Sequence, residues 1–246
     1  GYGRKDAQPV TAGCYGLSVL TAVTAQNTLG VVATLPLPEA FIREQFTAIS
    51  GDMRIDAVKI GMLGSMEAAA TVAGLLETLD GVPVVLDTVL RSTGGQPLFP
   101  DGNAGRMRQL LFPHAWLITP NLPETAVLAG LEREPRTREE VEEAALRLHR
   151  EGARSVLVKG GHGGDGECRD CLLHDGGFFW FSNPRIETVN THGTGCTLSS
   201  AIACQLALGK GMPDAVELAV AYTRAAIVAG AGMRLGHGHG PLQHFF

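Results

Sequence analysis

Three short apolar runs, each followed at once by polar side chains, constrain the fold of this chain most. They cover residues 84–86, 116–119 and 155–158. The first reads Val-Val-Leu without alternation of apolar and polar residues, which is typical of a central parallel strand covered on both faces. The polar groups that follow the runs are Asp87, then Asn121 with Glu124, then Lys159 with His162. Because ligands bind beyond the carboxyl ends of strands in open parallel sheets, this repeated placement predicts one shared site.

Segments with helical signals lie between and around these runs. Residues 65–79 begin with Ser65 as an N-cap and are followed by Gly81, and residues 137–151 begin with a capping-box pair, Thr137 and Glu140. The other predicted helices are residues 38–50, 197–208 and 212–233. Strands that alternate with helices predict an α/β fold with a mostly parallel central sheet and helices on both faces. Since no linker or repeat divides the chain, we expect a single domain over residues 1–246.

Further strands are predicted outside the three central runs. Residues 15–28 are rich in β-branched side chains and predict a buried strand, and residues 57–60 predict another. Residues 171–174 and 178–181 flank the sequence Asp-Gly-Gly, which predicts an antiparallel hairpin. This hairpin either covers a nucleotide or is a plain edge of the sheet.

Residues 190–200, Asn-Thr-His-Gly-Thr-Gly-Cys-Thr-Leu-Ser-Ser, join a β-like run to an Ala-rich helical run. Gly193 and Gly195 fall where the loop becomes a helix, and glycine there lets backbone N–H groups come close to a ligand. The unpaired N–H groups and the helix dipole suit an anion such as phosphate. The same field is expected to lower the pKa of Cys196 and make it a proton acceptor or nucleophile. A tight turn with a small residue at the helix start explains the stretch equally well.

The charge pattern excludes several classes of function. The formal net charge of −5 leaves no basic surface for nucleic acid or an anionic membrane, so local donors must hold any negatively charged substrate. No run of 18 apolar residues is present, and the first residues lack the apolar core of a signal peptide. We therefore expect a soluble cytoplasmic protein.

The cysteines and histidines have weaker signals. The five cysteines, at positions 14, 168, 171, 196 and 204, are an odd number scattered over a long chain, which fits free thiols in a reducing compartment. Cys168 and Cys171 have the spacing of half a zinc site, but no second pair accompanies them. Because glycines 163, 164 and 166 precede them, we interpret both as plain thiols on a mobile surface loop. The histidines near the carboxyl terminus, His237, His239 and His244, do not favour a metal site.

Residues 190–199 resemble the signature of the hydroxymethylpyrimidine and phosphomethylpyrimidine kinases of thiamine biosynthesis, a branch of the ribokinase-like superfamily. Other branches carry Gly-x-Gly-Asp here with Asp as the base, whereas this branch and some pyridoxal kinases carry Cys. Residues 24–28, 59–63 and 121–124 also match the family. The match runs from residue 15 to the carboxyl end, and it implies a ribokinase-like fold.

The resemblance implies roles for individual residues. The catalytic residues would be Gly193, Thr194, Gly195 and Cys196. The substrate-binding residues would be Gln26, Met62 and Val89. The nucleotide, ATP, would contact Asn121, Lys159 and Thr194, and Mg²⁺ would be organised by Asp87 and Glu124. These residue types suit the chemistry, because an amide offers a donor and an acceptor to an aminopyrimidine and carboxylates suit Mg²⁺. Asn121 with Glu124 also reads as a capping box, and Met62 also reads as simple core.

The match fails in two places. Family members begin with a strand and a glycine-rich loop that contacts the substrate, whereas residues 1–14 align poorly, so the first family strand is missing from this sequence. Residues 91–95, Arg-Ser-Thr-Gly-Gly, stand where the family has Lys-Ser-Gly. Either the chain is trimmed, or substrate binding is altered.

The resemblance implies a Mg·ATP-dependent kinase that phosphorylates the hydroxymethyl group of 4-amino-5-hydroxymethyl-2-methylpyrimidine and then the resulting monophosphate. We expect a homodimer, since relatives commonly form dimers. A pyridoxal kinase of the same superfamily is the nearest alternative, because its substrate is also a flat heteroaromatic ring with a hydroxymethyl group. A non-catalytic pyrimidine-binding module is the alternative that the two departures favour.

Overall fold

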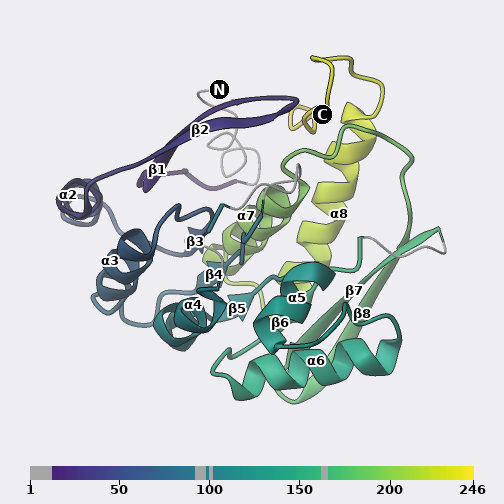
Figure 1. Ribbon diagram of the computed structural model, residues 1–246, viewed down its shortest axis with the longest axis horizontal. Coiled ribbons are helices and arrows are strands. Elements are labelled where there is room, and N and C mark those ends of the chain that lie inside the picture. Colours follow the sequence, from purple (N-terminus) through teal and green to yellow (C-terminus); the bar gives the residue numbers. More distant parts are fainter. Residues whose placement is uncertain (1–12, 92–97, 100–101, 162–165) are drawn as a thin grey trace.

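The computed structural model describes residues 13–91, 98–99, 102–161 and 166–246 (Figure 1). Within them lie an antiparallel hairpin, β1 (Ala22–Asn27) and β2 (Gly30–Pro36), and a six-stranded sheet in the order β3-β4-β5-β6-β7-β8. The strands of this sheet are β3 (Val58–Ile60), β4 (Val84–Leu86), β5 (Leu117–Ile118), β6 (Val156–Val158), β7 (Glu167–His174) and β8 (Gly177–Pro184). Strands β3 to β6 are parallel and the last two pairings are antiparallel. The predicted mostly parallel sheet is confirmed.

Helices follow most strands of the larger sheet. They are α2 (Glu39–Ser50), α3 (Met66–Leu76), α4 (Ala104–Leu111), α5 (Leu122–Ala129), α6 (Arg138–Arg150), α7 (Thr194–Ala207), α8 (Met212–Gly230) and the 3-10 helix η1 (Phe112–His114). The five predicted helices are all present, although α3 ends at Leu76 rather than at residue 79, and α8 ends at Gly230 rather than at residue 233. In the described part of the chain, no helix has the length and hydropathy to cross a membrane.

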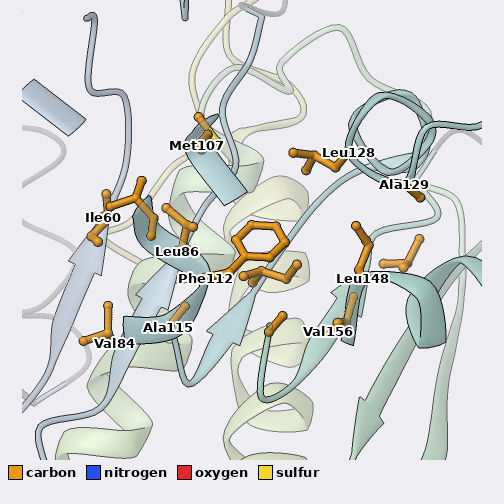
Figure 2. Packing of buried hydrophobic residues seen from close by; sticks show 14 of the residues in the cluster. Ile60, Val84, Leu86, Met107, Phe112, Ala115, Leu128, Ala129, Leu148 and Val156 are labelled. Atoms are coloured by element: carbon orange, nitrogen blue, oxygen red, sulfur yellow. The ribbon is translucent and has the colours of Figure 1, made fainter. Parts of the chain in front are cut away.

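The sheet is covered by helices on both faces, as predicted. Residues of one strand alternate between the faces: Val84 and Leu86 pack in a cluster with residues of α3, α4 and α6, whereas Val85 packs in a second cluster with residues of α7 and α8. Figure 2 shows the first cluster, in which Phe112 lies among side chains from the sheet and the helices. Burial on both faces explains why the central strands are continuous apolar runs.

The predicted hairpin after β6 is confirmed and is longer than expected, because β7 and β8 pair over eight residues each. Asp175 and Gly176 at its tip both have positive φ, 47° and 75°, as a two-residue type I′ turn requires. The surface loop predicted around Cys168 is wrong, because Cys168 lies in β7 together with Cys171, which the predicted hairpin strand already contains. Three positions apart, they point to opposite faces of the strand, and Cys171 is fully buried.

The buried strand predicted for residues 15–28 is also wrong. Only Ala22–Asn27 form a strand, and it pairs with β2 outside the six-stranded sheet. Its apolar neighbours are exposed, with 80% of Tyr15 and 80% of Val32 accessible to solvent. The β-branched composition indicates a strand but says nothing of what covers it.

Candidate active site

A buried ion pair joins the ends of two parallel strands. Asp87 follows β4 and Lys159 follows β6, and the Nζ of Lys159 donates to Oδ1 of Asp87 over 2.9 Å. The Asp87 side chain is 2% exposed and that of Lys159 is 15% exposed. The carboxyl ends of the strands therefore bring together two residues that the sequence predicted to share a site.

Each charge of this pair stabilises the other. Burial alone would raise the pKa of Asp87, but Lys159 and Lys59 and two hydrogen bonds lower it below its ordinary value. Burial alone would lower the pKa of Lys159, but the charges of Asp87 and Glu124 raise it. Both groups are therefore ionised at neutral pH.

Asp87 also connects the sheet to α7. Its Oδ1 accepts a hydrogen bond from Oγ1 of Thr119 at 3.1 Å, and its Oδ2 accepts one from Oγ of Ser199 at 3.3 Å. Ser199 lies on the second turn of α7, so this contact fixes the start of that helix beside the carboxyl end of β4.

Asn121 and Glu124 form the predicted capping box at the start of α5. The side chain of Asn121 accepts from the N–H of Glu124 at 2.8 Å, and Oε2 of Glu124 accepts from the N–H of Asn121 at 2.9 Å. Oε2 also accepts from Oγ1 of Thr88 at 3.3 Å. Burial, and the like charge of Asp87, raise the pKa of Glu124 although Lys159 acts in the opposite direction. The positive charge of Lys159 therefore does not offset the burial of Glu124 and the charge of Asp87. A cation bound near Glu124 would stabilise its ionised form.

The start of α7 lies against the ion pair. Gly193 is its N-cap with φ +89°, a conformation that favours glycine. A Cβ on Gly195 would lie 3.2 Å from Nζ of Lys159 and 3.8 Å from Oδ2 of Asp87. The first-turn N–H groups have no acceptor within the helix, and the positive end of its dipole faces the same corner. This arrangement can bind an anionic phosphoryl group between backbone donors and an ammonium.

Thr194 and Cys196 belong to the same turn. Oγ1 of Thr194 donates to the carbonyl oxygen of Thr191 at 2.8 Å, so this hydroxyl stabilises the turn. Cys196 is partly exposed, and the negative charge of its thiolate form would raise the pKa of Lys159. The sulfur is therefore within electrostatic reach of the lysine.

The three residues predicted to bind substrate lie on separate segments. Gln26 on β1 is exposed, and its Nε2 lies 3.3 Å from Nε2 of His192 in the loop before α7. The carbonyl oxygen of Met62 accepts from Oγ1 of Thr21 at 3.0 Å, which links the end of β3 to the start of the hairpin strand. Val89 follows Asp87 by two residues, and its N–H donates to the Asp87 carbonyl at 2.8 Å. The contacts connect Gln26 to the loop before α7 and place Val89 next to Asp87.

The carboxyl-terminal segment that follows α8 contacts the turn between β1 and β2. The N–H groups of His237 and Gly238 donate to Oγ1 of Thr28 at 3.3 Å each, so the segment lies beside the β1–β2 hairpin (Figure 1). Nδ2 of the buried Asn190 donates to the carbonyl oxygens of Gly230 and Met233 at 2.7 Å each. These bonds join the loop before α7 to the end of α8.

Other predicted features lie apart from the site or outside the described residues. The described residues contain no group of three or more His, Cys, Asp and Glu side chains placed to hold a metal ion. His162 and residues 92–95 of the altered loop lie outside the part of the chain that the structure describes.

Sequence reasoning missed four polar residues of the site: Lys59, Thr88, Thr119 and Ser199. Thr88 and Thr119 stand at the carboxyl ends of apolar runs, the signal that found their neighbours Asp87 and Asn121. Lys59 is a charged residue inside an apolar strand, which is also a readable signal. Ser199 lies at the end of the matched stretch 190–199, but its contact with Asp87 depends on how α7 packs against β4.

The fold and the site define a small-molecule kinase of the ribokinase-like class. The family described as "Phosphomethylpyrimidine kinase" matches residues 9–243, and the chain belongs to this family. Its members are ATP-dependent phosphotransferases, so the predicted class of enzyme is confirmed.

Relatives from bacteria agree with this assignment. The hydroxymethylpyrimidine/phosphomethylpyrimidine kinase of Escherichia coli is 40% identical over 233 residues, which are 95% of this chain and 87% of that protein. A thiamine biosynthesis bifunctional protein of Geobacter sulfurreducens is 45% identical over 240 residues, which are 97% of this chain. The chain spans about half of that relative, 48% of its length.

Solved structures are similar over most of the chain. The phosphomethylpyrimidine kinase of Clostridium difficile 630 has a TM-score of 0.79 and 34% identity, with 91% of each chain covered. The pyridoxal kinase of Staphylococcus aureus in complex with pyridoxal has a TM-score of 0.86 and 30% identity, with 98% of this chain and 86% of that chain covered. An ADP complex of Bacillus subtilis pyridoxal kinase has a TM-score of 0.87 and 29% identity, with 98% and 91% covered.

Proposed function

We propose that this enzyme transfers the terminal phosphoryl group of ATP to the hydroxymethyl group of 4-amino-5-hydroxymethyl-2-methylpyrimidine, and then transfers a second one to the resulting monophosphate. The observation that carries the proposal is the Asp87–Lys159 ion pair packed against Gly195 at the start of α7. It places an ammonium and backbone N–H donors at one point, where they can stabilise the negative charge on the phosphoryl group during its transfer.

In the proposed reaction, the backbone and the side chains of the corner have different tasks. Gly195 and Cys196 present first-turn N–H groups to the phosphoryl oxygens, while the N–H of Thr194 donates to the carbonyl oxygen of Thr191 at 3.3 Å and Gly193 provides the backbone conformation that starts the turn. Lys159 balances charge on the nucleotide phosphates, beside Asn121 at the start of α5. The thiolate of Cys196 accepts the proton of the substrate hydroxyl. Because phosphoryl transfer has a loose transition state, most of the acceleration comes from positioning and electrostatics.

The substrate contacts are part of the same proposal. The carboxamide of Gln26 recognises the aminopyrimidine edge, since it can donate and accept hydrogen bonds. Met62 packs against the ring, and Val89 borders it beside Asp87. The support is local: Gln26 contacts the loop before α7, and Met62 follows the strand that adjoins β4.

The carboxylates of the corner fit a magnesium ion. Mg²⁺ is held by one or two carboxylates together with substrate phosphates and water, and Glu124 is a buried carboxyl with a raised pKa that a nearby cation would ionise. Asp87 is already paired with Lys159, so we assign Glu124 as the carboxylate nearest the ion and Asp87 as the second. When bound, the ion would neutralise charge on the nucleotide phosphates.

A homodimer completes the proposal. Apolar side chains of the β1–β2 hairpin are exposed, including Val23 at 45%, Val32 at 80% and Leu35 at 65%. A second copy of the chain would cover such a surface, because large exposed apolar patches mark interaction sites. Sedimentation of a Val32→Asp variant as a monomer, and of the parent as a dimer, would support this part.

Pyridoxal phosphorylation is a second candidate function. It is favoured by the similarity to the pyridoxal kinase of S. aureus, whose structure is solved in complex with pyridoxal. Turnover measured on pyridoxal and on the pyrimidine alcohol at equal concentrations separates the two, and the higher kcat/KM on the pyrimidine is the expected result.

The test of the proposed reaction compares Cys196→Ala with Cys168→Ala in a coupled assay of ADP formation. General base catalysis contributes about 10²- to 10⁴-fold, so turnover of the pyrimidine alcohol by Cys196→Ala should fall by at least about 10²-fold. ATP binding, followed by isothermal titration, should change little. The Cys168→Ala control, altered on β7, should keep full activity. Unchanged turnover in Cys196→Ala removes the thiol from the mechanism, and binding without ADP formation by the parent enzyme refutes the kinase activity.

A further inference from the structure

Lys59 is a lysine at the centre of the apolar strand β3. Its register partner on β4 is Val85, which packs in the cluster formed with α7 and α8. Because partners on neighbouring parallel strands share a face of the sheet, Lys59 lies on the face that α7 covers. A charged side chain on this face must reach the edge of the sheet or an opposite charge.

The ammonium of Lys59 reaches the carboxyl edge of the sheet. A Cβ built on Gly61 would lie 2.6 Å from Nζ of Lys59, so the side chain runs along its own strand toward the residue before Met62. Any larger residue at position 61 would displace the ammonium. The group is therefore placed beside the segment that we assign to the substrate.

Two lysines flank Asp87 from opposite sides. Lys159 comes from β6, two strands away from β4, and contacts the corner at Gly195. Lys59 comes from β3, and the N–H of Asp87 donates to the carbonyl oxygen of Ile60, the next residue, at 2.9 Å. The charge of Lys59 acts on Asp87. Asp87 and Glu124 both act on Lys159, so Lys59 is the ammonium that stands on the β3 side of the corner, away from the Lys159 pair.

The two transfers place different demands on this charge. In the first, the hydroxyl oxygen bonds to the terminal phosphorus of ATP, the bridging P–O bond breaks, ADP leaves, and a proton is released to a base. In the second, an oxygen of the acceptor phosphate dianion bonds to the terminal phosphorus of another ATP, the bridging P–O bond of that ATP breaks and ADP leaves. No proton needs to be removed. The acceptor now has to approach the nucleotide phosphates against like-charge repulsion, which a nearby cation relieves.

We propose that Lys59 binds the phosphate group of the acceptor in the second transfer and thereby determines whether the enzyme uses a phosphorylated acceptor. Lys159 binds the nucleotide phosphates from the α7 side, and Lys59 binds the phosphate of the acceptor from the β3 side. This inference rests on the proposed function, because it assigns a residue to one of its two steps.

The experiment measures kcat/KM on the alcohol and on its monophosphate for Lys59→Gln and for Lys59→Arg. Loss of a charged hydrogen-bond partner corresponds to about 10- to 100-fold. We therefore expect Lys59→Gln to lower the ratio of monophosphate to alcohol activity by at least about tenfold, mainly through KM for the monophosphate. Lys59→Arg should restore most of the ratio. The matched control is Lys210→Gln, because Lys210 is exposed and far along the chain at the end of α7.

Three outcomes are distinguishable. A selective loss on the monophosphate supports the inference. An equal loss on both acceptors, or no loss, in a variant whose thermal unfolding matches the control overturns it while the proposed function stands. If the parent enzyme phosphorylates neither acceptor, the proposed function fails instead. Cys196→Ala provides a further check, because it should impair the alcohol reaction more than the monophosphate reaction.

Discussion

Replacement of Lys159 by methionine tests how far stability depends on the ion pair with Asp87. Methionine keeps much of the aliphatic length but leaves the buried carboxylate without its main partner. Breaking a buried pair in this way costs about 3–5 kcal/mol. Asp87 keeps its hydrogen bonds from Thr119 and Ser199, so we expect the low end, about 3 kcal/mol. For a chain of this size, that lowers Tm by about 6–12 °C.

The assay is thermal unfolding without nucleotide, with Lys210→Met as the exposed control. The double variant Asp87→Asn/Lys159→Met should be more stable than Lys159→Met, because it leaves no buried charge unpaired. A Tm of Lys159→Met equal to that of the control refutes the reasoning. So does a double variant in which the two losses add.

The pH dependence has a definite sign. The folded pKa of Asp87 lies below its ordinary 3.8, so its stabilisation is present above pH 3.8 and is lost as the pH falls through the folded value. The folded pKa of Lys159 lies above 10.5, so its stabilisation is present below pH 10.5 and is lost as the pH rises through the folded value. In Lys159→Met the buried Asp87 can bind a proton more readily, so the difference in Tm from the parent should shrink as the pH falls toward 4, close to the ordinary value of 3.8.

Three further predictions concern other parts of the fold. Asn190→Ala removes the buried amide that holds the end of α8 and should lower the free energy of unfolding by about 3 kcal/mol in a urea titration. Gly238→Ala places a Cβ 2.1 Å from the carbonyl oxygen of Thr28 and should destabilise by about 1–3 kcal/mol, whereas Gly232→Ala, with open space around it, should not. Burial raises the pKa of Cys171 to about 12, so mass spectrometry after iodoacetamide treatment at neutral pH should find it alkylated only in denaturant.

Much of the central architecture could be predicted from local signals. The apolar runs of β4, β5 and β6 are buried on both faces, so their composition alone indicates parallel strands. The capping boxes at Asn121 and Thr137 are local hydrogen-bond patterns, and their sequence spacing is sufficient to place two helix starts. Because the carboxyl ends of parallel strands share an edge, the meeting of Asp87 with Lys159 followed as well.

The remaining features depend on contacts between distant segments. The β1–β2 hairpin is exposed where the sequence predicts a buried strand, since strand propensity carries no information about what covers the strand. Lys59 can be noticed in the sequence as a charged residue inside an apolar strand, but its place beside Asp87 depends on the register of β3 with β4 and on the cover by α7. The single domain over residues 1–246 stays a prediction.

The most direct test of the account is a crystal structure of the enzyme with Mg²⁺, a non-hydrolysable ATP analogue and the pyrimidine alcohol. We predict oxygens of the terminal phosphate at about 3 Å from the backbone nitrogens of Gly195 and Cys196, with Lys159 on the same phosphates and the Cys196 sulfur facing the substrate hydroxyl. A terminal phosphate far from the start of α7, or a Cys196 sulfur turned into packed hydrocarbon, would contradict the account.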